Sequence, residues 1–415
     1  MIIVKVVVLL LIIGLSREDQ DFFLGESVET GFIDVGRGKL FYWLFSPRYK
    51  KEDSPVLLWL QGGPGCSNGL ALFYENGPFF INDDMTLRKN PYSWNNNSYT
   101  IYLEQPVGTG YSTVNRYVAT EEQVAHDIYV FLNKLFDKHP EFAKNNFFIS
   151  GESYAGHYIP ALAQYILQQK DNKINLKGAA MGNGLVSAYY QYPSYSDYAY
   201  RMGNISSTLY TVTTFGFSIC KALLAVDLWQ FAMPICQITY FLIIGTPLKQ
   251  YFNQYDVRRP CPNPPDCYNT SNLDPFYNNK TVRNLINTTG YPYVSYNYIV
   301  HAFLFVDWWF SYTDAIAYVL NTGKVDFMSY NGDMDFLCNW IGGERWAKNL
   351  NWKGKEEFNK AQYKNWIYDG KVQATYKVYD KFSFVVVKDV GHMVPMDNPK
   401  FSLELINKFM FEGIK

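Results

Sequence analysis

The sequence has few cysteines, almost no net charge and no bias toward glycine or proline, and each shortage excludes a class of protein. Six Cys in 415 residues are too few for a scaffold built on disulfides. A formal net charge of −1 offers no positive field to phosphates, so nucleic acid is not an expected partner. Gly 29 and Pro 19 are near average usage, which excludes collagen-like and low-complexity architecture.

Apolar and aromatic residues, by contrast, are plentiful. Hydrophobic residues make up 48% and charged residues 18%, which is enough for a sizeable core and excludes disorder of the whole chain. At roughly 150 residues per domain, the length allows two or three domains, or one large domain with an insertion. Aromatic residues reach 18%, an excess that by itself names no function.

The N-terminal segment 1–16 predicts a secretory signal peptide, because it is apolar apart from Lys5 and ends in small residues. It falls short of the roughly 18 apolar residues that a membrane anchor needs. A second apolar stretch, 222–245, is broken by polar residues and proline, among them Asp227 and Pro234, so we expect buried helical structure there. We therefore expect a secretory-pathway protein, lysosomal, vacuolar or secreted, with no membrane span in the mature chain.

Sequons and cysteine spacings agree with an oxidising compartment. Three of five N-x-S/T sequons fall within 269–289, which suggests an exposed region. Cys261 and Cys267 could close a short Pro-rich loop, and Cys220 and Cys236 could bridge the second apolar stretch. Neither spacing fits a zinc site. The candidate glycosylation sites are Asn96, Asn204, Asn269, Asn279 and Asn287.

Helical periodicity alternates with short apolar strands in two parts of the chain, which is typical of a parallel sheet with helical crossovers. Residues 188–310 are rich in Tyr and Asn and lack this alternation, so we interpret them as an insertion. We predict strands over 39–46, 56–59, 99–103, 147–150, 178–181, 325–330 and 384–387. We predict helices over 121–137, from the turn after the strand 147–150 to about 167, over 312–320, and after Asn398-Pro399. The predicted organisation is a signal peptide (1–16), a first core part (17–187), a cap insertion (188–310) and a second core part (311–415).

Ser153 is a candidate nucleophile. It lies in G-E-S-Y-A-G (151–156), between a predicted strand and a predicted helix, where α/β-hydrolases expose their nucleophilic Ser on a tight turn. The strict pattern has Gly where this chain has Ala155, so an ordinary strand–helix turn is the alternative interpretation.

A nucleophilic Ser needs a base, and only five His are available. His392 alone follows a strand, in a loop before the last helix. His126 lies on a surface-type helix, and His139 ends that helix. His157 is expected to pack locally, and His301, in an apolar run, to be a satisfied core histidine.

The base in turn needs a carboxylate, and Asp333 and Asp335 follow the strand at 325–330. Two such Asp could bind a metal, but no other ligands cluster nearby, and we expect neither metal nor cofactor. One Asp would shape the turn while the other reaches His392. The order Ser, Asp, His is the α/β-hydrolase order, so we predict an α/β-hydrolase fold: a mixed, mostly parallel sheet flanked by helices, with an inserted cap.

Residues 61–65 (Q-G-G-P-G) follow a strand and leave backbone N–H groups free to meet a developing oxyanion. A phosphate-binding loop is the competing interpretation. It fails because neither Lys-Ser/Thr nor G-x-G-x-x-G follows.

Taken together, these segments resemble the serine carboxypeptidases of vacuoles and lysosomes, the peptidase family S10 that includes carboxypeptidase Y and cathepsin A. The resemblance is very specific, because the matching motifs run in order from residue 59 to residue 395. They are W-L-Q-G-G-P-G-C-S (59–67), N-P-Y-S-W-N (90–95), E-Q-P-V-G (104–108), G-E-S-Y-A-G-H-Y-I-P (151–160), Y-D-V-R-R-P-C (255–261), G-D-M-D-F-L-C-N (332–339) and G-H-M-V-P (391–395).

The resemblance implies a role for each matching position. Ser153 would be the nucleophile, His392 the base and Asp335, rather than Asp333, the acid. The backbone N–H groups of Gly63 and Tyr154 would form the oxyanion hole. Two Glu beside a bound carboxylate cannot all be charged, so one must hold a proton, and an acidic working pH follows. The substrate carboxylate would be bound by Trp59, Gln61, Glu75 and Glu152.

The sequence departs from the family's best-known form at three points. Gln61 stands where many members have Asn, and it keeps the donors but adds a methylene. Cys66 commonly pairs with a Cys near position 295, where this chain has Ser295, and the insertion has a short cysteine complement. Cys338, beside the acid, is expected to be a buried free thiol.

The implied function is a serine-type carboxypeptidase that releases C-terminal amino acids from peptides and proteins at acidic pH. One alternative is an acyltransferase, which would pass the acyl group to an alcohol. Another is a non-catalytic protective or binding protein, against which the intact Ser153, Asp335 and His392 argue. The expected partners are peptide or protein C-termini, and a homodimer is left open.

Overall fold

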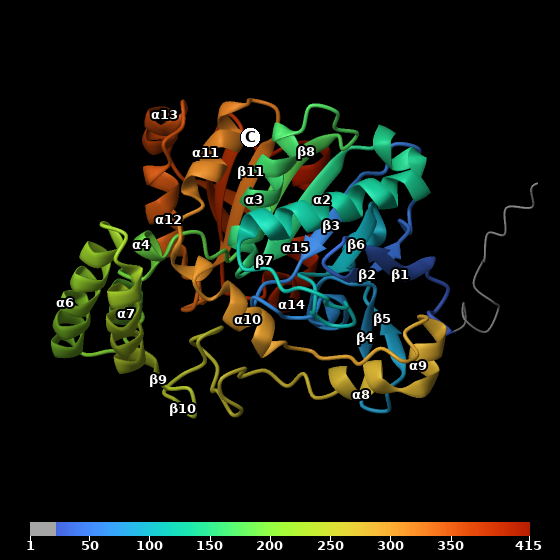
Figure 1. The fold of residues 1–415 in the computed structure, drawn as a ribbon. Coiled ribbons are helices and arrows are strands. Elements are labelled where there is room, and N and C mark those ends of the chain that lie inside the picture. The colour runs from blue at the N-terminus through green and yellow to red at the C-terminus, as the bar shows by residue number, and fades with distance from the viewer. Residues whose placement is uncertain (1–21) are drawn as a thin grey trace, which may run out of the picture.

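A ten-stranded sheet runs through the middle of the molecule (Figure 1). This computed structural model describes residues 22–415, so the predicted signal peptide at 1–16 lies outside the described residues. The strand order is β1-β2-β6-β3-β7-β8-β11-β14-β13-β12. The run from β6 to β14 is parallel and both edges are antiparallel, which confirms the predicted mixed sheet. The strands are β1 (Val28–Asp34), β2 (Lys39–Phe45), β3 (Val56–Leu60), β6 (Tyr99–Glu104), β7 (Phe147–Glu152), β8 (Leu176–Gly182), β11 (Asp326–Gly332), β12 (Lys364–Tyr368), β13 (Lys371–Tyr379) and β14 (Phe382–Val387).

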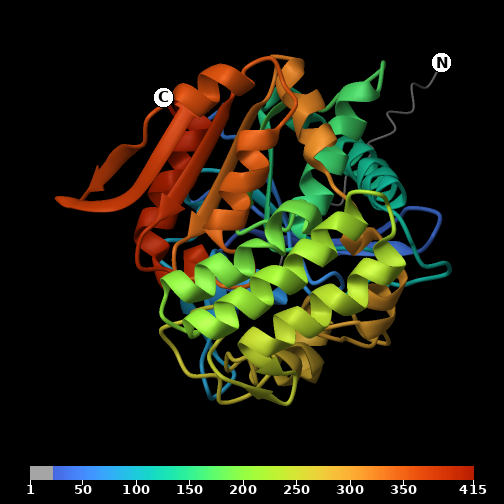
Figure 2. The ribbon, with the colours of Figure 1, turned by 90° about the vertical axis from the view of Figure 1, so that its left-hand side faces the viewer.

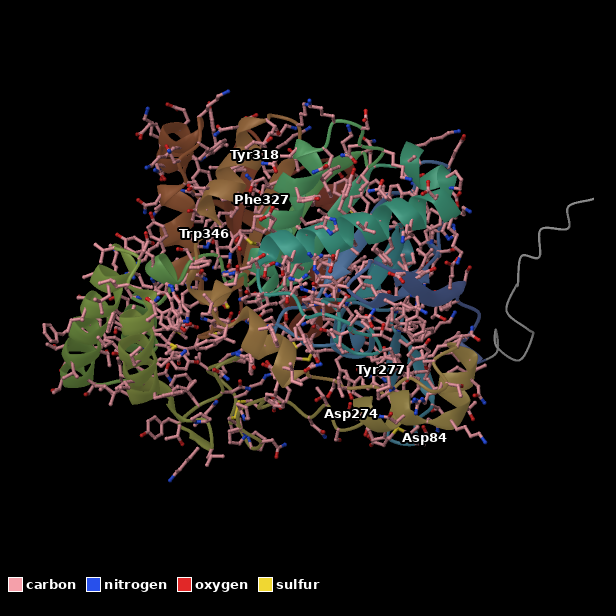
Figure 3. The ribbon with its side chains drawn as sticks, viewed as in Figure 1. Asp84, Asp274, Tyr277, Tyr318, Phe327 and Trp346 are labelled. Atoms are coloured by element: carbon pink, nitrogen blue, oxygen red, sulfur yellow. A yellow bond between two sulfur atoms is a disulfide. The ribbon has the colours of Figure 1, made fainter. Side chains whose placement is uncertain are left out.

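Strand β2 shows how this sequence covers both faces of the sheet. Successive side chains of a strand point to opposite faces, so a strand buried on both sides is apolar throughout. On one face, the ring of Tyr42 lies 5.4 Å from that of Phe131. On the other face, the ring of Trp43 lies 6.3 Å from that of Tyr277, which Figure 3 labels. Part of the aromatic excess therefore lies in the core between the sheet and its helices.

Helices cover each face of the sheet (Figure 1), as the prediction required. Helices α2, α3, α11 and α12 pack on one face. Trp346 of α12 and Phe327 of β11, which Figure 3 labels, lie on this face, and the ring of each is close to that of Phe382. Helix α15 and the short helix η1 pack on the other face. Asn398 caps α15 by accepting from the backbone N–H of Phe401, with Pro399 at the first helical position, as predicted. The bounds are α2 (Glu121–Lys138), α3 (Ala155–Gln168), α11 (Thr313–Asn321), α12 (Trp340–Asn349), α13 (Lys355–Lys360), α14 (Val394–Asp397), α15 (Pro399–Phe411) and η1 (Ala71–Glu75).

Between β8 and β11 the chain leaves the main sheet. In the described chain, the strands of this stretch, β9 (Gly245–Thr246) and β10 (Lys249–Gln250), pair only with each other. Two disulfides, Cys220–Cys236 and Cys261–Cys267, close the loops that the cysteine spacing allowed. The helices are α4 (Ala188–Gln191), α5 (Ser194–Arg201), α6 (Ser207–Leu224), α7 (Trp229–Ile244), α8 (Leu273–Asn278), α9 (Lys280–Leu285), α10 (Tyr298–Leu304) and η4 (Asp307–Trp309).

Helices α6 and α7 form a hairpin at one side of the molecule, which faces the viewer in Figure 2. The prediction of helical structure over 222–245 is right, but the prediction that it is buried is wrong. Phe231 and Ile238 are each 63% exposed, whereas Cys236 and Ile243 face inward. A mostly apolar stretch of sequence does not reveal that only one side of the hairpin packs against the rest of the chain. No helix in residues 22–415 is long and apolar enough to cross a membrane.

Candidate active site

Ser153 lies on the sharp turn between β7 and α3, at the carboxyl end of a central parallel strand. Its φ of +65° is a left-handed conformation that non-glycine residues rarely adopt. Backbone hydrogen bonds hold the turn: the Ser153 N–H donates to Gly182 O at 3.1 Å, and Ser153 O accepts from Leu185 N at 2.9 Å.

Ala155 is tolerated in this turn because the residue facing it lacks a side chain. A Cβ on Gly151 would lie 2.9 Å from the Cβ of Ala155 and 2.2 Å from the Leu60 carbonyl oxygen. Gly156 is also restricted, since a Cβ there would lie 2.2 Å from Leu185 O. Glycine at 151 therefore leaves room for the methyl group of Ala155, and glycine at 156 lets the turn lie against the backbone of Leu185.

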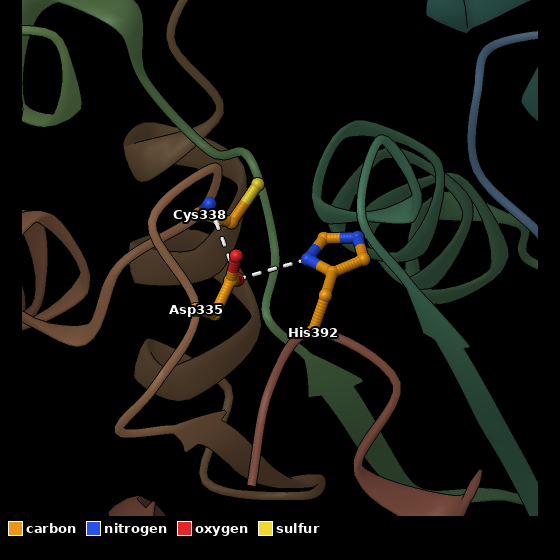
Figure 4. Close-up of side chains that lie close together, drawn as sticks. All are labelled: Asp335, Cys338 and His392. Carbon is orange, nitrogen blue, oxygen red and sulfur yellow. Dashed lines mark hydrogen bonds and ion pairs between the residues drawn. The ribbon is translucent and has the colours of Figure 1, made fainter. Parts of the chain in front are cut away.

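His392 and Asp335 meet at the same edge of the sheet (Figure 4). The Nδ1 atom of His392 lies 2.8 Å from Oδ2 of Asp335, and the Nε2 side of the ring points away from it. Nε2 lies 4.0 Å from Oε1 of Glu152, the residue directly before Ser153. The backbone N–H of His392 donates to Tyr255 O at 2.7 Å. The second ring nitrogen of His392 is therefore turned toward the serine turn.

Two further donors converge on Asp335, which is fully buried. Its Oδ2 accepts from Nδ2 of Asn183 at 2.7 Å and from the backbone N–H of Cys338 at 3.1 Å. These donors fix the carboxylate in the orientation that meets the imidazole. Asp333 instead accepts from the backbone N–H of Asp389 at 2.8 Å and ties together the loops after β11 and β14.

Gly62 and Gly63 bring a loop of backbone against the serine turn. A Cβ on Gly62 would lie 2.5 Å from Tyr154 N and 2.6 Å from Glu152 O, so only glycine permits this approach. Gly63 has a φ of +111°. Within residues 22–415, neither the Gly63 N–H nor the Tyr154 N–H donates to a protein acceptor. Free N–H groups beside a nucleophile can stabilise a developing oxyanion.

A buried acidic cluster adjoins the turn. Trp59 Nε1 donates to Gln61 Oε1 at 2.9 Å. Burial raises the pKa of Glu75 to about 7, and burial together with Glu75 raises the pKa of Glu152 well above its usual range. Because two adjacent buried carboxyls cannot both ionise, this pair holds at least one proton. The Glu75 oxygens make no hydrogen bond with another described residue, so a proton held on this carboxyl is free to be donated to a ligand.

Comparison with known proteins agrees with this geometry. The serine carboxypeptidase family model matches residues 19–412. The chain belongs to the serine carboxypeptidase family. It is 40% identical over 387 residues to a protein named serine carboxypeptidase-like from Oryza sativa subsp. japonica, covering 89% of each chain. It is 34% identical over 400 residues to carboxypeptidase Y of Komagataella phaffii, covering 92% of this chain and 75% of that relative.

The fold of this serine carboxypeptidase is also shared with a solved structure. The crystal structure of KEX1(delta)p, a prohormone-processing carboxypeptidase from Saccharomyces cerevisiae, superposes with a TM-score of 0.83 at 23% identity. The match covers 92% of this chain and 91% of that chain. The predicted α/β-hydrolase fold is therefore confirmed.

The other histidines of this serine carboxypeptidase have distinct surroundings. His126 is half-buried on α2, and His139 follows α2 and contacts Glu29. His157 is fully buried and its Nδ1 lies 3.1 Å from Oδ2 of Asp307. The expectation of a satisfied core histidine at His301 is wrong: the residue is half-buried, and its Nδ1 is buried without a hydrogen-bond partner among the described residues. Burial lowers the pKa of His301.

Two buried clusters bring together groups that can ligate metals. One is Asp335, Cys338 and His392, and the other is Glu121, His157 and Asp307. In each cluster a carboxylate already accepts several hydrogen bonds, so hydrogen bonding accounts for both arrangements without a cation.

Asn183 and Asp307 are not among the candidate residues predicted from the sequence. Asn183 sits in Gly-Asn-Gly at the carboxyl end of β8, and a polar residue at that end of a central parallel strand is a signal that could have identified it. Asp307 lies in an apolar stretch far from every motif, and nothing local marks it. Cys66 and Cys338 are free thiols.

The sequons differ in accessibility. Asn269, Asn279 and Asn287 are exposed, in agreement with the expected exposed region, and Asn204 is half-buried. Asn96 is only 7% exposed. Its Nδ2 donates to Pro91 O at 2.9 Å and its Oδ1 accepts from Arg48. Its amide nitrogen is enclosed in the folded chain, so Asn96 is the least accessible of the five sequons.

Proposed function

We propose that this chain removes single amino acids from the C-termini of peptides and proteins, through an acyl-enzyme on Ser153. The observation that carries the proposal is the 4.0 Å separation between His392 Nε2 and the buried carboxyl of Glu152. A carboxylate-binding group directly beside the nucleophile places the terminal carboxylate of a peptide there. Only the last peptide bond then reaches Ser153, so this geometry favours an exopeptidase.

The proposed chemistry uses His392 twice. Ser153 Oγ attacks the carbonyl carbon of the last peptide bond while its proton passes to His392 Nε2. The N–H groups of Gly63 and Tyr154 stabilise the oxyanion, and Asp335 orients the ring and stabilises the imidazolium. The C–N bond then breaks as His392 protonates the leaving amine. Water then attacks the acyl carbon while His392 Nε2 takes its proton, the bond between the acyl carbon and Ser153 Oγ breaks, and His392 returns the proton to Oγ.

The substrate carboxylate would be bound by Trp59, Gln61, Glu75 and Glu152. The buried Glu pair supports this role because a protonated carboxyl can donate a hydrogen bond to a carboxylate, whereas an ionised one repels it. The pKa of Glu75, raised by burial to about 7, keeps that proton in place in acidic solution. An acidic working pH follows.

We also propose a place in the secretory pathway, lysosomal, vacuolar or extracellular. The two disulfides support this, since disulfides persist in oxidising compartments. Exposed Asn269, Asn279 and Asn287 are the sites we expect to carry glycans. A homodimer stays a prediction, which sedimentation of the purified protein checks.

The deciding experiment incubates the purified protein with an N-blocked dipeptide at about pH 5, where a buried acid pair keeps its proton. We expect release of the single C-terminal amino acid, and loss of that release in Ser153→Ala. Equal activity of Ser153→Ala would overturn the mechanism. Product analysis with an alcohol acceptor tests the acyltransferase alternative. Failure of the wild type to react with an active-site organophosphonate would favour the alternative of a non-catalytic protective or binding protein.

A further inference from the structure

Asp307 is a buried carboxylate that the proposed reaction does not use. It belongs to η4, outside the main sheet, and is 2% exposed. The Tyr312 hydroxyl donates to both of its oxygens at 3.0 Å. Nδ1 of His157 and the Tyr154 hydroxyl lie 3.1 and 3.2 Å from its Oδ2. The backbone N–H of Glu121 adds a longer contact of 3.4 Å to its Oδ1.

The surrounding groups identify Asp307 as the anion of this cluster. Burial raises the pKa of Glu121 well above its usual range, and the neighbouring charge on Asp307 adds to this, so Glu121 is neutral. Burial lowers the pKa of His157, so its ring is neutral and donates through Nδ1. The donors that converge on Asp307 are what a buried carboxylate requires in place of water.

Tyr154 links this cluster to the reaction site. It follows Ser153 directly, and its backbone N–H is one of the proposed oxyanion donors. Its ring is 1% exposed and stacks on Trp308, with ring centroids 5.6 Å apart and planes at 21°. On its other sides lie Tyr158 and His157, at centroid distances of 5.1 and 4.6 Å. The hydroxyl at the far end of the ring is held by Asp307.

We infer that Asp307 is a positioning residue for acyl transfer, which holds Tyr154 so that its backbone N–H meets the oxyanion. The serine turn needs such support because Ser153 has a left-handed backbone conformation that an isolated chain would relax. Asp307 acts on Tyr154 at one end and on the first turn of α3, through His157, at the other. This inference rests on the proposed function.

The test compares the loss of one tyrosine hydroxyl that bonds to Asp307 with the loss of another. Tyr154→Phe removes the hydroxyl that couples Asp307 to the serine turn, and Tyr312→Phe removes a hydroxyl that does not. We expect kcat for the blocked dipeptide to fall about tenfold in Tyr154→Phe and about 10–100-fold in Asp307→Asn, with KM within about twofold. Tyr312→Phe is expected to keep kcat within about threefold of the wild type.

The affinity for an inhibitor and the effect of a double variant distinguish a positioning role of Asp307 from a general loss of folded enzyme. A peptide aldehyde, which forms an oxyanion on Ser153, should lose affinity in Asp307→Asn in parallel with kcat, at unchanged active-site titre. In the double variant Asp307→Asn/Tyr154→Phe, the loss in kcat should not exceed that of Asp307→Asn alone. Unchanged kcat in Asp307→Asn, equal losses in the two Tyr variants, or a loss confined to KM would each overturn the inference. An inactive wild type would instead reject the proposed function.

Discussion

The Nδ1 atom of His392 lies 2.8 Å from Oδ2 of Asp335, although the two residues are 57 positions apart in the sequence. Asp335 follows β11 and His392 follows β14, and these parallel strands are neighbours in the sheet. Because Asn183 and the Cys338 N–H hold the same oxygen, the carboxylate has one orientation. Asp333, two residues earlier, bonds to a different loop.

Asp335→Asn should therefore remove most of the activity, whereas Asp333→Asn should retain it. An amide at 335 disturbs the tautomer of His392 and no longer stabilises the imidazolium. We expect kcat to fall about 10⁴-fold, with KM little changed. Steady-state kinetics on the blocked dipeptide checks this. If Asp333→Asn were the more damaged variant, the assignment of the acid would be wrong.

Binding of the substrate carboxylate should weaken as the pH rises through about 7, the pKa to which burial raises Glu75. The neutral acid is the binding form, so affinity is complete below that pKa and is lost above it. We expect KM to rise about tenfold per pH unit once Glu75 ionises. Glu75→Gln cannot ionise and should flatten this rise in a KM–pH profile. A rise of equal slope in the variant would contradict the role of Glu75.

Gly62→Ala should impair the reaction with little change in substrate binding. The new Cβ would lie 2.5 Å from Tyr154 N, so the backbone of one segment must move. A displaced oxyanion donor costs about 10²–10³ in kcat. Gly31→Ala is the control, since its nearest neighbour is a tyrosine side-chain atom at 3.3 Å. Wild-type kcat in Gly62→Ala would show that the loop tolerates the shift.

Glu29 should stabilise the fold in a pH-dependent way. Burial alone would raise its pKa, but hydrogen bonds from His139, Lys138 and Tyr42 outweigh it and lower the pKa to about 2. The stabilisation is complete above the ordinary pKa of about 4.5 and disappears as the pH falls toward 2. After allowance for solvent screening of this partly exposed group, Glu29→Gln should cost about 1–2 kcal/mol near neutral pH. Urea unfolding of both proteins across the acidic range checks this, and a constant difference would refute it.

The Cys220–Cys236 bridge should stabilise the α6–α7 hairpin locally. It closes a sequence separation of 16 residues, for which loop entropy predicts about 3 kcal/mol. Replacing both cysteines by serine should accelerate amide hydrogen exchange in the hairpin and leave exchange in the main sheet unchanged. Faster exchange in β7 or β8 would show that the hairpin supports the core.

Much of the fold was predictable because it depends on local patterns. Apolar runs such as β3 and helical spacing such as that of α2 are set by neighbouring residues, and chain order placed Ser153, an Asp and His392 at strand ends. The Cys220–Cys236 and Cys261–Cys267 pairings could also be predicted, because each disulfide closes a short loop of sequence.

The amino-acid sequence alone determined the parallel sheet, the serine turn and the set of candidate residues, because periodicity and glycine requirements act over a few residues. Tertiary structure decided which Asp meets His392, that Asn183 holds it, and that Asp307 holds Tyr154, because those contacts join residues far apart in the chain. It also decided that one side of α7 faces solvent and that Asn96 is enclosed. Hydrophobicity along the chain indicates which side chains favour burial, but only the packing of the whole fold determines which of them are buried.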